Sequence, residues 1–284
     1  MTATTVPTLT LIRLCALQEL RLSVRSRWTQ IFAVVFGGLS LAVAGSGYIL
    51  SGGSGLQDFS RIAASLVELV LLLVPLTALL FGVMAFTPDA GAAELLYSQP
   101  VARPVILIGK LVGLGGALLA SEAVGFGLAG LLVFSRTGAD GLTSFLGVIA
   151  GAFILTIVFL SIAAALTAGA TSTRRAHQMA IALVIWFVAV VLFDVAALGV
   201  ASLLRSGTAS RLLMVAAIVN PVDAVRTGTL LAVEGTTAFG AASLAFLRMT
   251  GGGAGAGLWL GGSLLSWIAL ALTAAVWRVR RADI

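Results

Sequence analysis

The sequence predicts an all-α integral membrane protein with six transmembrane helices, and three observations lead to this fold class. Hydrophobic residues make up 60% of the 284 residues and charged residues only 10%, whereas soluble domains average roughly 45–50% and 25%. The mean hydropathy of +1.12 is too high for a chain whose whole surface faces water. Six continuous apolar stretches reach the roughly 20 residues that a helix needs to cross a bilayer.

The six apolar stretches are interpreted as helical spans. Strands of a membrane barrel would instead form segments of about ten residues in which apolar and polar residues alternate. The predicted spans are 31–50, 62–86, 111–134, 142–170, 179–204 and 254–277. They leave little sequence between them, so we expect one transmembrane domain over 1–284 and no separate soluble domain.

Three of the predicted spans each contain one acidic residue, namely Glu68, Glu122 and Asp194. A carboxylate at the centre of a bilayer costs about 3 kcal/mol by insertion scales, so each should face the bundle interior, a water-filled cavity or a partner group. Two interpretations stay open. Either the acids form a substrate or proton pathway, or they are protonated or hydrogen-bonded carboxyl groups that fix helix packing. We expect Asp194, the deepest, to lie at a helix interface.

The distribution of Lys and Arg predicts which ends of the spans face the cytoplasm. An even number of spans places both chain ends on one side, and cytoplasmic flanks retain positive charge. That side would carry Arg13, Arg21, Arg25, Arg27, Arg103, Lys110, Arg174, Arg175, Arg278, Arg280 and Arg281. The other side would carry fewer basic residues, most of them in the long segment 205–253, whose charge counts for less. Both termini are therefore expected in the cytoplasm.

Basic residues are interleaved with leucines in segment 9–27, directly before the first span. We interpret this segment as an interfacial elbow helix on the cytoplasmic membrane surface; the alternative is a polar extension of the first spanning helix. The first apolar stretch begins too far along the chain, and is too long, for a cleavable signal peptide. We therefore expect the N-terminus to be retained.

Segment 205–253 is the longest connection between predicted spans. It contains an apolar run, 212–219, that is too short to cross a bilayer and that Asn220 and Pro221 end. This pattern predicts a pair of half-inserted or interfacial helices on the outer face, since irregular backbone at membrane depth must be covered by protein or water. The glycine run at 251–253 is expected to form a joint before the last span.

Pairs of glycines four residues apart occur in several predicted helices. The pairs are Gly109 with Gly113, Gly147 with Gly151, and Gly257 with Gly261. Such spacing lets helix backbones approach closely, so the pairs support a packed bundle.

The sequence contains no motif for catalysis, metal binding or nucleotide binding. His177 stands beside two arginines, and Cys15 is the single cysteine, so neither belongs to a ligand cluster. Gly109 and Lys110 lack the upstream glycine and the hydroxyl residue of a phosphate-binding loop. We therefore expect no enzyme activity, metal or cofactor in this chain. Nucleic acid is not an expected partner either, because the basic residues are scattered at span ends.

The segment after the second predicted span reads TPDAGAAELLYSQPVAR at 87–103 and continues to a Gly109–Lys110 pair. It resembles the first cytoplasmic loop of ABC-2 type ABC transporter permeases, whose pattern is a glycine, then E-L-L-x-S-x-P, then an arginine and a G-K pair. The matching residues are Gly91, Glu94, Leu95, Leu96, Ser98, Pro100, Arg103, Gly109 and Lys110. Pro88 and Asp89 stand where the family usually has acidic residues.

Two further stretches carry a narrower resemblance. LFDV at 192–195 and NPVDAVR at 220–226 are similar to NosY-type permeases, the membrane subunits of ABC complexes required to mature copper-containing nitrous oxide reductase. In such a complex a periplasmic partner docks on the outer face. The residues expected to form a docking or gating surface for it are Asn220, Pro221, Asp223 and Arg226. The alternative is a local cap in which Asp223 and Arg226 satisfy each other or the backbone.

The resemblance implies a type V exporter-like ABC-2 transmembrane domain in the bacterial inner membrane. It also implies a dimer of this chain and two ATPase subunits that bind ATP and Mg²⁺. Segment 88–104 would be the coupling loop that receives force from the ATPase. The residues expected to contact that subunit are Asp89, Gly91, Glu94, Leu95, Leu96 and Arg103.

Two other functions remain open at this point. One is an ABC-2 exporter of a lipid, peptide or drug-like molecule. The other is a proton-coupled secondary transporter that uses Glu68, Glu122 or Asp194. Because the sequence shows no ladder of Cys, His or Met, we expect the chain to transmit conformational change or to pass a non-metal cargo, such as a sulfur species, in preference to copper.

Overall fold

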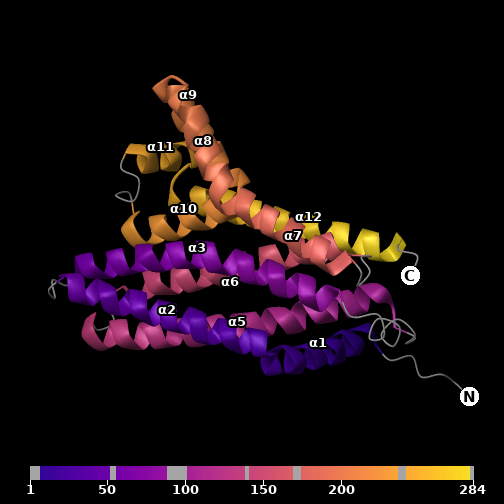
Figure 1. Cartoon of the computed structure of the whole chain (residues 1–284). Helices are drawn as coiled ribbons and strands as arrows, with labels where there is room; N and C mark the ends of the chain where they lie inside the picture. The colour runs from indigo at the N-terminus through magenta and orange to yellow at the C-terminus, as the bar shows by residue number, and fades with distance from the viewer. Residues whose placement is uncertain are drawn as a thin grey trace, which may run out of the picture.

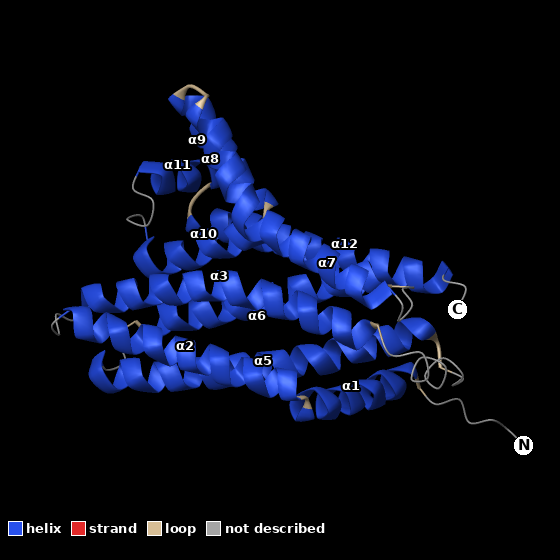
Figure 2. Cartoon of the chain, in the orientation of Figure 1, coloured by secondary structure: helices blue, strands red, loops and turns tan. Residues whose placement is uncertain are grey.

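The computed structural model describes residues 7–51, 56–87, 101–137, 141–168, 174–235 and 241–281, and all regular secondary structure within them is helical (Figure 2). This confirms the predicted all-α class. The helices are α1 Thr8–Arg25, α2 Arg27–Ser51, α3 Leu56–Phe86, α5 Arg103–Thr137, α6 Leu142–Thr167, α7 Arg175–Phe187, the π-helix η2 Val188–Leu192, α8 Phe193–Ser202, α9 Ser206–Val219, α10 Pro221–Glu234, α11 Ala241–Thr250 and α12 Gly253–Arg281.

Six helical stretches in the described residues are long and apolar enough to cross a membrane, which confirms the predicted number. They are Arg27–Ser46, Arg61–Phe86, Arg103–Ser135, Leu142–Thr167, Arg175–Ser202 and Gly253–Arg281. Three of the helices themselves begin at an arginine, α2 at Arg27, α5 at Arg103 and α7 at Arg175, before the apolar starts that the sequence predicts. A long basic side chain at such a position can reach the polar headgroups while its backbone stays helical.

The central bundle consists of α2, α3, α5 and α6, which lie side by side (Figure 1). Phenylalanine rings fill its interior: Phe36 packs edge-on against Phe126 with ring centroids 5.2 Å apart, and Phe126 packs in the same way against Phe145. A Cβ at Gly125 would lie 2.6 Å from the Phe36 ring. The close approach of α2 and α5 therefore requires glycine at this position.

One end of the bundle, here called the basic end, gathers the C-terminal ends of α3 and α12 with the N-terminal ends of α5 and α7 (Figure 1). Arg103, Lys110 and Arg175 lie there, and Arg278 of α12 donates a 2.7 Å hydrogen bond to the Ala165 carbonyl of α6. The helix α1 lies along the same end. Both ends of the described chain are therefore on one side of the bundle, as six spans require.

The glycine pair Gly109 and Gly113 forms the contact between α5 and α1. A Cβ at Gly109 would collide with Cys15, and one at Gly113 would collide with the carbonyl of Ala16. A second pair, Gly147 and Gly151, faces α10 in the same manner. Both pairs thus bring helices of this chain together, as predicted. The third pair, on α12, has no described atom within 4 Å. That α1 lies on the membrane surface stays a prediction.

The fifth span combines α7, η2 and α8 and is the least covered of the six. Its mean hydropathy of 2.8 is the highest of the six spans, yet only 6% of the residues in its most apolar stretch are buried within the chain. The outer part, α8, packs against α9 and rises away from the central bundle (Figure 1). A helix this apolar must meet lipid or another protein chain in the membrane.

The described part of segment 205–253 contains three helices, and its location on the outer face stays a prediction. α9 ends at Val219 and α10 begins at Pro221, with a bend of 103° between the two helices. Proline suits this place because the first position of a helix needs no N–H donor. A third helix, α11, follows, which the predicted pair of helices does not include. Gly251 and Gly252 then take φ angles of +80° and +103°, which glycine tolerates, and α12 starts directly after them.

Topology is tested with a single cysteine in a Cys15→Ser background. Ala176 is exposed at the start of α7, so Ala176→Cys should react with a membrane-impermeant maleimide only after the inner membrane is opened. Ser206→Cys, at the start of α9, is the matched control and should react in intact spheroplasts. Labelling of Ala176→Cys in intact spheroplasts would overturn the predicted orientation.

Candidate functional site

The candidate site begins with Asn220, which caps α10. Its Oδ1 accepts a 3.1 Å hydrogen bond from the Val222 N–H, a standard way to satisfy a free N–H at a helix start. Its Nδ2 donates to the Ala189 carbonyl of η2 at 2.8 Å and to Asp223 Oδ2 at 3.1 Å. One amide side chain therefore fixes the start of α10 against the π-helical turn of the fifth span.

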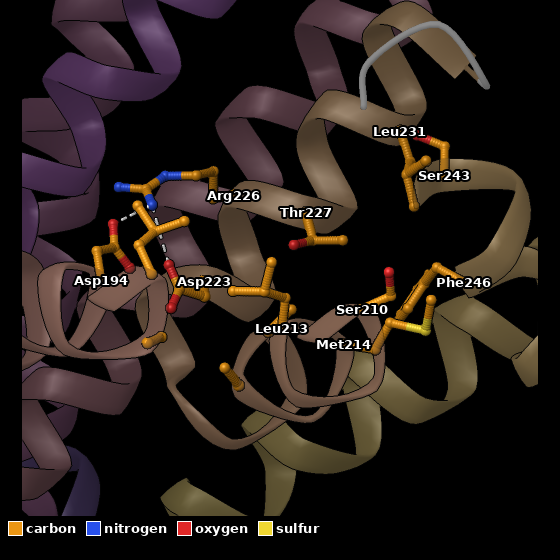
Figure 3. Close-up of a pocket in the computed structure, with 14 residues that line it drawn as sticks. Asp194, Ser210, Leu213, Met214, Asp223, Arg226, Thr227, Leu231, Ser243 and Phe246 are labelled. Atoms are coloured by element: carbon orange, nitrogen blue, oxygen red, sulfur yellow. Dashed lines mark hydrogen bonds and ion pairs between the residues drawn. The ribbon is translucent and has the colours of Figure 1, made fainter. Parts of the chain in front are cut away.

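Arg226 joins three helices. It lies one turn after Asp223 on α10, and its Nη1 donates to Asp223 Oδ1 at 3.0 Å. The same Nη1 donates to Asp194 Oδ2 of α8, and Nε lies 3.6 Å from Glu68 Oε1 of α3. We call Glu68, Asp194, Asn220, Asp223 and Arg226 the Arg226 cluster. It connects α3, α8 and α10, and Figure 3 shows Arg226 with its partners Asp194 and Asp223.

The π-helix explains how Asp194 reaches this position. A π-turn inserts an extra residue into a helix and rotates everything after it, and such turns are frequent at functional sites. Asp194 follows η2 directly, and the Ala189 carbonyl inside η2 accepts the hydrogen bond from Asn220. The backbone irregularity therefore has a polar partner at membrane depth, as a bilayer requires.

The charges in the Arg226 cluster do not balance. Three carboxyl groups, from Glu68, Asp194 and Asp223, share one guanidinium, so the formal sum is −2. Only 22% of the Arg226 side chain is exposed, compared with 63% for Glu68, so Glu68 is the member most open to its surroundings. Loss of the guanidinium would leave two poorly solvated carboxylates facing each other, which is costly.

The residues predicted as an outer-face docking surface lie inside the protein in this conformation. Asn220 is 4% exposed and Asp223 is 8% exposed, and Pro221 is also buried. Their side chains are turned inward because they cap α10 and bind Arg226. The structure therefore shows a helix-joining site where the sequence predicts a surface, and partner docking stays a prediction.

Glu122 lies apart from the Arg226 cluster, between α5 and α6. The Thr156 hydroxyl donates to its Oε1 at 2.5 Å, and Oε2 has no hydrogen-bond partner among the described residues. Glu122 is only 1% exposed. Its surroundings suit a carboxyl group that fixes the packing of two helices, while its role in transport stays a prediction.

A second polar site closes the C-terminal end of α3 at the basic end. Lys110 Nζ donates to the Ala85 carbonyl at 2.8 Å, and Arg175 Nε donates to the Thr87 carbonyl at 3.0 Å. Cations at this position satisfy the free carbonyls of a helix end and oppose its negative dipole. We call Lys110 and Arg175 the α3 clamp.

The α3 clamp also includes α1, because Glu19 lies 3.9 Å from Lys110. Burial raises the pKa of Glu19 above its ordinary value, and the charge of Lys110 opposes that shift. The Gly109–Lys110 pair of the sequence motif thus has two structural tasks. Glycine admits α1 against α5, and lysine connects α1 with the end of α3.

The predicted coupling residues Asp89, Gly91, Glu94, Leu95 and Leu96 lie outside the described residues. Arg103 is described and begins α5. The α3 clamp binds the carbonyls of Ala85 and Thr87, just before this segment. The sequence analysis did not predict these contacts. The sequence analysis used Arg175 only to predict topology. Its position at the start of a span was the one sign that it could bind the free carbonyls of a neighbouring helix end.

Removing the guanidinium should destabilise the outer helices. Arg226→Gln leaves Asp194 and Asp223 without their cation, and we expect a loss of about 2–3 kcal/mol, reduced from a fully buried pair by partial exposure. Asp194→Asn, which keeps an acceptor, should cost less than Asp194→Leu. Unfolding of purified variants in mixed SDS–detergent micelles measures these differences, with Arg211→Gln on the exposed side of α9 as control. Equal stability of Arg226→Gln and Arg211→Gln would contradict the assignment.

Comparison with known proteins agrees with this architecture. The family model described as ABC-2 family transporter protein matches residues 14–284. A probable ABC transporter permease protein NosY from Pseudomonas aeruginosa is 31% identical over 271 residues, covering 93% of this chain and 97% of the relative. A protein of the same name from Stutzerimonas stutzeri is 32% identical over 278 residues, covering 94% and 96%. The chain therefore belongs to the ABC-2 transporter family, as a NosY-like permease subunit.

Proposed function

We propose that this permease subunit couples ATP hydrolysis by a separate ATPase to a conformational change at the Arg226 cluster, within a complex that matures the copper site of nitrous oxide reductase. Family membership implies an ATPase partner and a dimeric assembly. The coupling route, the enzyme that the complex serves and the inner-membrane location are parts of the proposal.

One observation carries the coupling proposal: the helical stretch α7–η2–α8 contacts both polar sites. At its start, Arg175 donates to the carbonyl of Thr87, which follows α3 and directly precedes segment 88–104. About 28 Å further along the axis, at 1.5 Å per residue, Asp194 binds Arg226. Movement of segment 88–104 by an ATPase would displace α7. That displacement would form or break the ion pair between Asp194 and Arg226, a rigid-body mode of switching.

The partners in this proposal have separate tasks. The ATPase subunits bind ATP and Mg²⁺ and move segment 88–104. A second copy of the permease covers apolar helix surface such as that of the fifth span. A periplasmic accessory protein receives the movement at the outer end, where α8 and α9 rise from the bundle (Figure 1). This chain then supplies mechanical transmission and no copper ligands of its own.

The maturation role has support from resemblance, and the exporter alternative has support from geometry. Both curated relatives are named NosY and are similar to this chain over nearly their full length. The stretches 192–195 and 220–226 that suggested the resemblance supply four of the five residues of the Arg226 cluster, all except Glu68. An exporter of a lipid, peptide or drug-like molecule stays a second candidate because an apolar cavity adjoins that cluster. The proton-coupled secondary transporter is a different class from the ABC family to which the chain belongs.

Two variants test the coupling route. Leu95→Asp in segment 88–104 should leave membrane insertion intact but weaken co-purification with the ATPase, or lower the transport-coupled ATPase rate by about tenfold, because an apolar contact is replaced by a charge. Arg175→Gln should preserve ATPase binding and reduce coupling, since only the α3 clamp changes. Leu142→Asp, at the opposite end, is the control. Normal binding and full activity of Leu95→Asp would rule out segment 88–104 as the coupling element.

The same variants distinguish the two candidate functions in the native host. If the maturation proposal is correct, deletion of this permease yields nitrous oxide reductase protein that lacks copper, and the wild-type chain restores copper while Leu95→Asp does not. Full copper loading in the deletion strain would exclude the maturation role. An ATPase-coupled export activity would then favour the exporter.

A further inference from the structure

A cavity of about 310 Å³ lies beside the Arg226 cluster, between α8, α9, α10 and α11 (Figure 3). Because a water molecule takes about 30 Å³ in the liquid, the space would hold about ten waters. It is also at the lower end of the size range of small-molecule sites. The cavity therefore has room for a small organic molecule.

The two ends of the cavity differ in chemistry. Asp194, Asp223 and Arg226 form one end, whereas Met214 and Phe246 lie at the other (Figure 3). Met214 is 9% exposed and Phe246 is 4% exposed, so this end is mainly apolar, with the hydroxyl of Ser210 beside them (Figure 3). A ligand that fits both ends has a polar head and an apolar body.

The charged end favours a cationic head. Two carboxylates and one guanidinium line it, so the lining carries a formal charge of −1, and Glu68 adds a further negative charge near Arg226. Arg226 already occupies the point between the carboxylates. Among the described residues, no three His, Cys, Asp or Glu side chains are placed to hold a metal ion. An organic cation at the open side of Asp194 is the better complement, since 27% of that side chain remains exposed.

Thr227 gives an independent sign of a ligand. It is 9% exposed, lines the cavity between the two ends, and its side chain projects into the space (Figure 3). Among the described residues its hydroxyl has no hydrogen-bond partner, unlike that of Thr229, two residues further along α10, which donates to a carbonyl of its own helix. The hydroxyl is therefore free to bond to a molecule inside the cavity. A ligand donor within the cavity would satisfy it.

We infer that this cavity binds an amphiphile with a protonated amine and a short apolar body. The ammonium group donates to Asp194 and Asp223 and to the hydroxyl of Thr227. The body lies against Leu213, Met214 and Phe246. All residues of this site come from one chain, and binding needs neither ATP nor the proposed coupling route. A failure of the proposed function would therefore leave this inference unaffected.

Three probes that share one chain length test the inference. Radiolabelled decylamine, decanol and decanoate are bound to the purified permease in lipid nanodiscs, and binding to empty nanodiscs is subtracted to remove lipid partitioning. Decylamine should bind saturably and about tenfold more tightly than decanol, since a hydrogen-bonded charge contributes about 1.5–3 kcal/mol. Decanoate should bind more weakly than either, because its charge is repelled.

Variants separate the charged end from the apolar end. Asp194→Asn and Asp223→Asn should each reduce decylamine affinity about tenfold and leave decanol binding within about twofold. Leu213→Trp fills the cavity without changing its charge and should weaken both probes. Glu122→Gln, which lies between α5 and α6, and Leu244→Trp, on the exposed side of α11, are matched controls and should bind like the wild type.

Several results would overturn the inference. Equal binding of decylamine and decanol would mean that the carboxylates carry no available negative charge. Preference for decanoate would make Arg226 the recognition group. Decylamine binding that Leu213→Trp leaves unchanged would place the probe elsewhere on the protein.

Discussion

The ion pairs of Arg226 are the interaction on which the outer half of the protein depends. α8 and α9 rise away from the central bundle (Figure 1), and their only buried residues within this chain are Ala201 and Met214, so apolar packing within the chain does little to fix them. Arg226 binds Asp194 on α8 and Asp223 on its own helix, and α10 packs against α3 and α6. A charge pair away from bulk water is stabilising only while it remains complete. Breaking the contacts of Arg226 would therefore leave uncompensated carboxylates between α8 and α10.

The fifth span connects the Arg226 cluster to the basic end. At its start Arg175 donates to the carbonyl of Thr87, the residue after α3, and further along the indole of Trp186 donates to the Leu72 carbonyl of α3, so α7 follows α3 over several turns. After η2 the direction changes and α8 leaves the bundle. Because packed helices move as rigid bodies more readily than they deform, α7 and α3 can transmit a displacement as one unit. The π-helix lies between this unit and Asp194.

Sequence reasoning predicted the features that depend on local composition. The spans follow from the length of apolar stretches, the break at Asn220 and Pro221 follows from proline chemistry, and the two glycine pairs that pack within the chain follow from their spacing. It could not predict that Asp194 meets Arg226, because the two residues are 32 positions apart and nothing in either stretch specifies the other. The π-helix was also missed, since its residues Val188–Leu192 are as apolar as any α-helical span. Burial of the expected docking residues follows from these long-range pairings.

The most direct test of this account is a double-mutant cycle on the Asp194–Arg226 pair. The free energy of unfolding is measured in mixed SDS–detergent micelles for the wild type, Asp194→Asn, Arg226→Gln and the double variant. If the pair joins α8 to α10, the two substitutions should couple by about 1–3 kcal/mol. The second substitution should lower the free energy of unfolding only slightly once the first has broken the contact. Additive effects, within about 0.5 kcal/mol, would show that the two side chains stabilise the protein independently and would contradict the account.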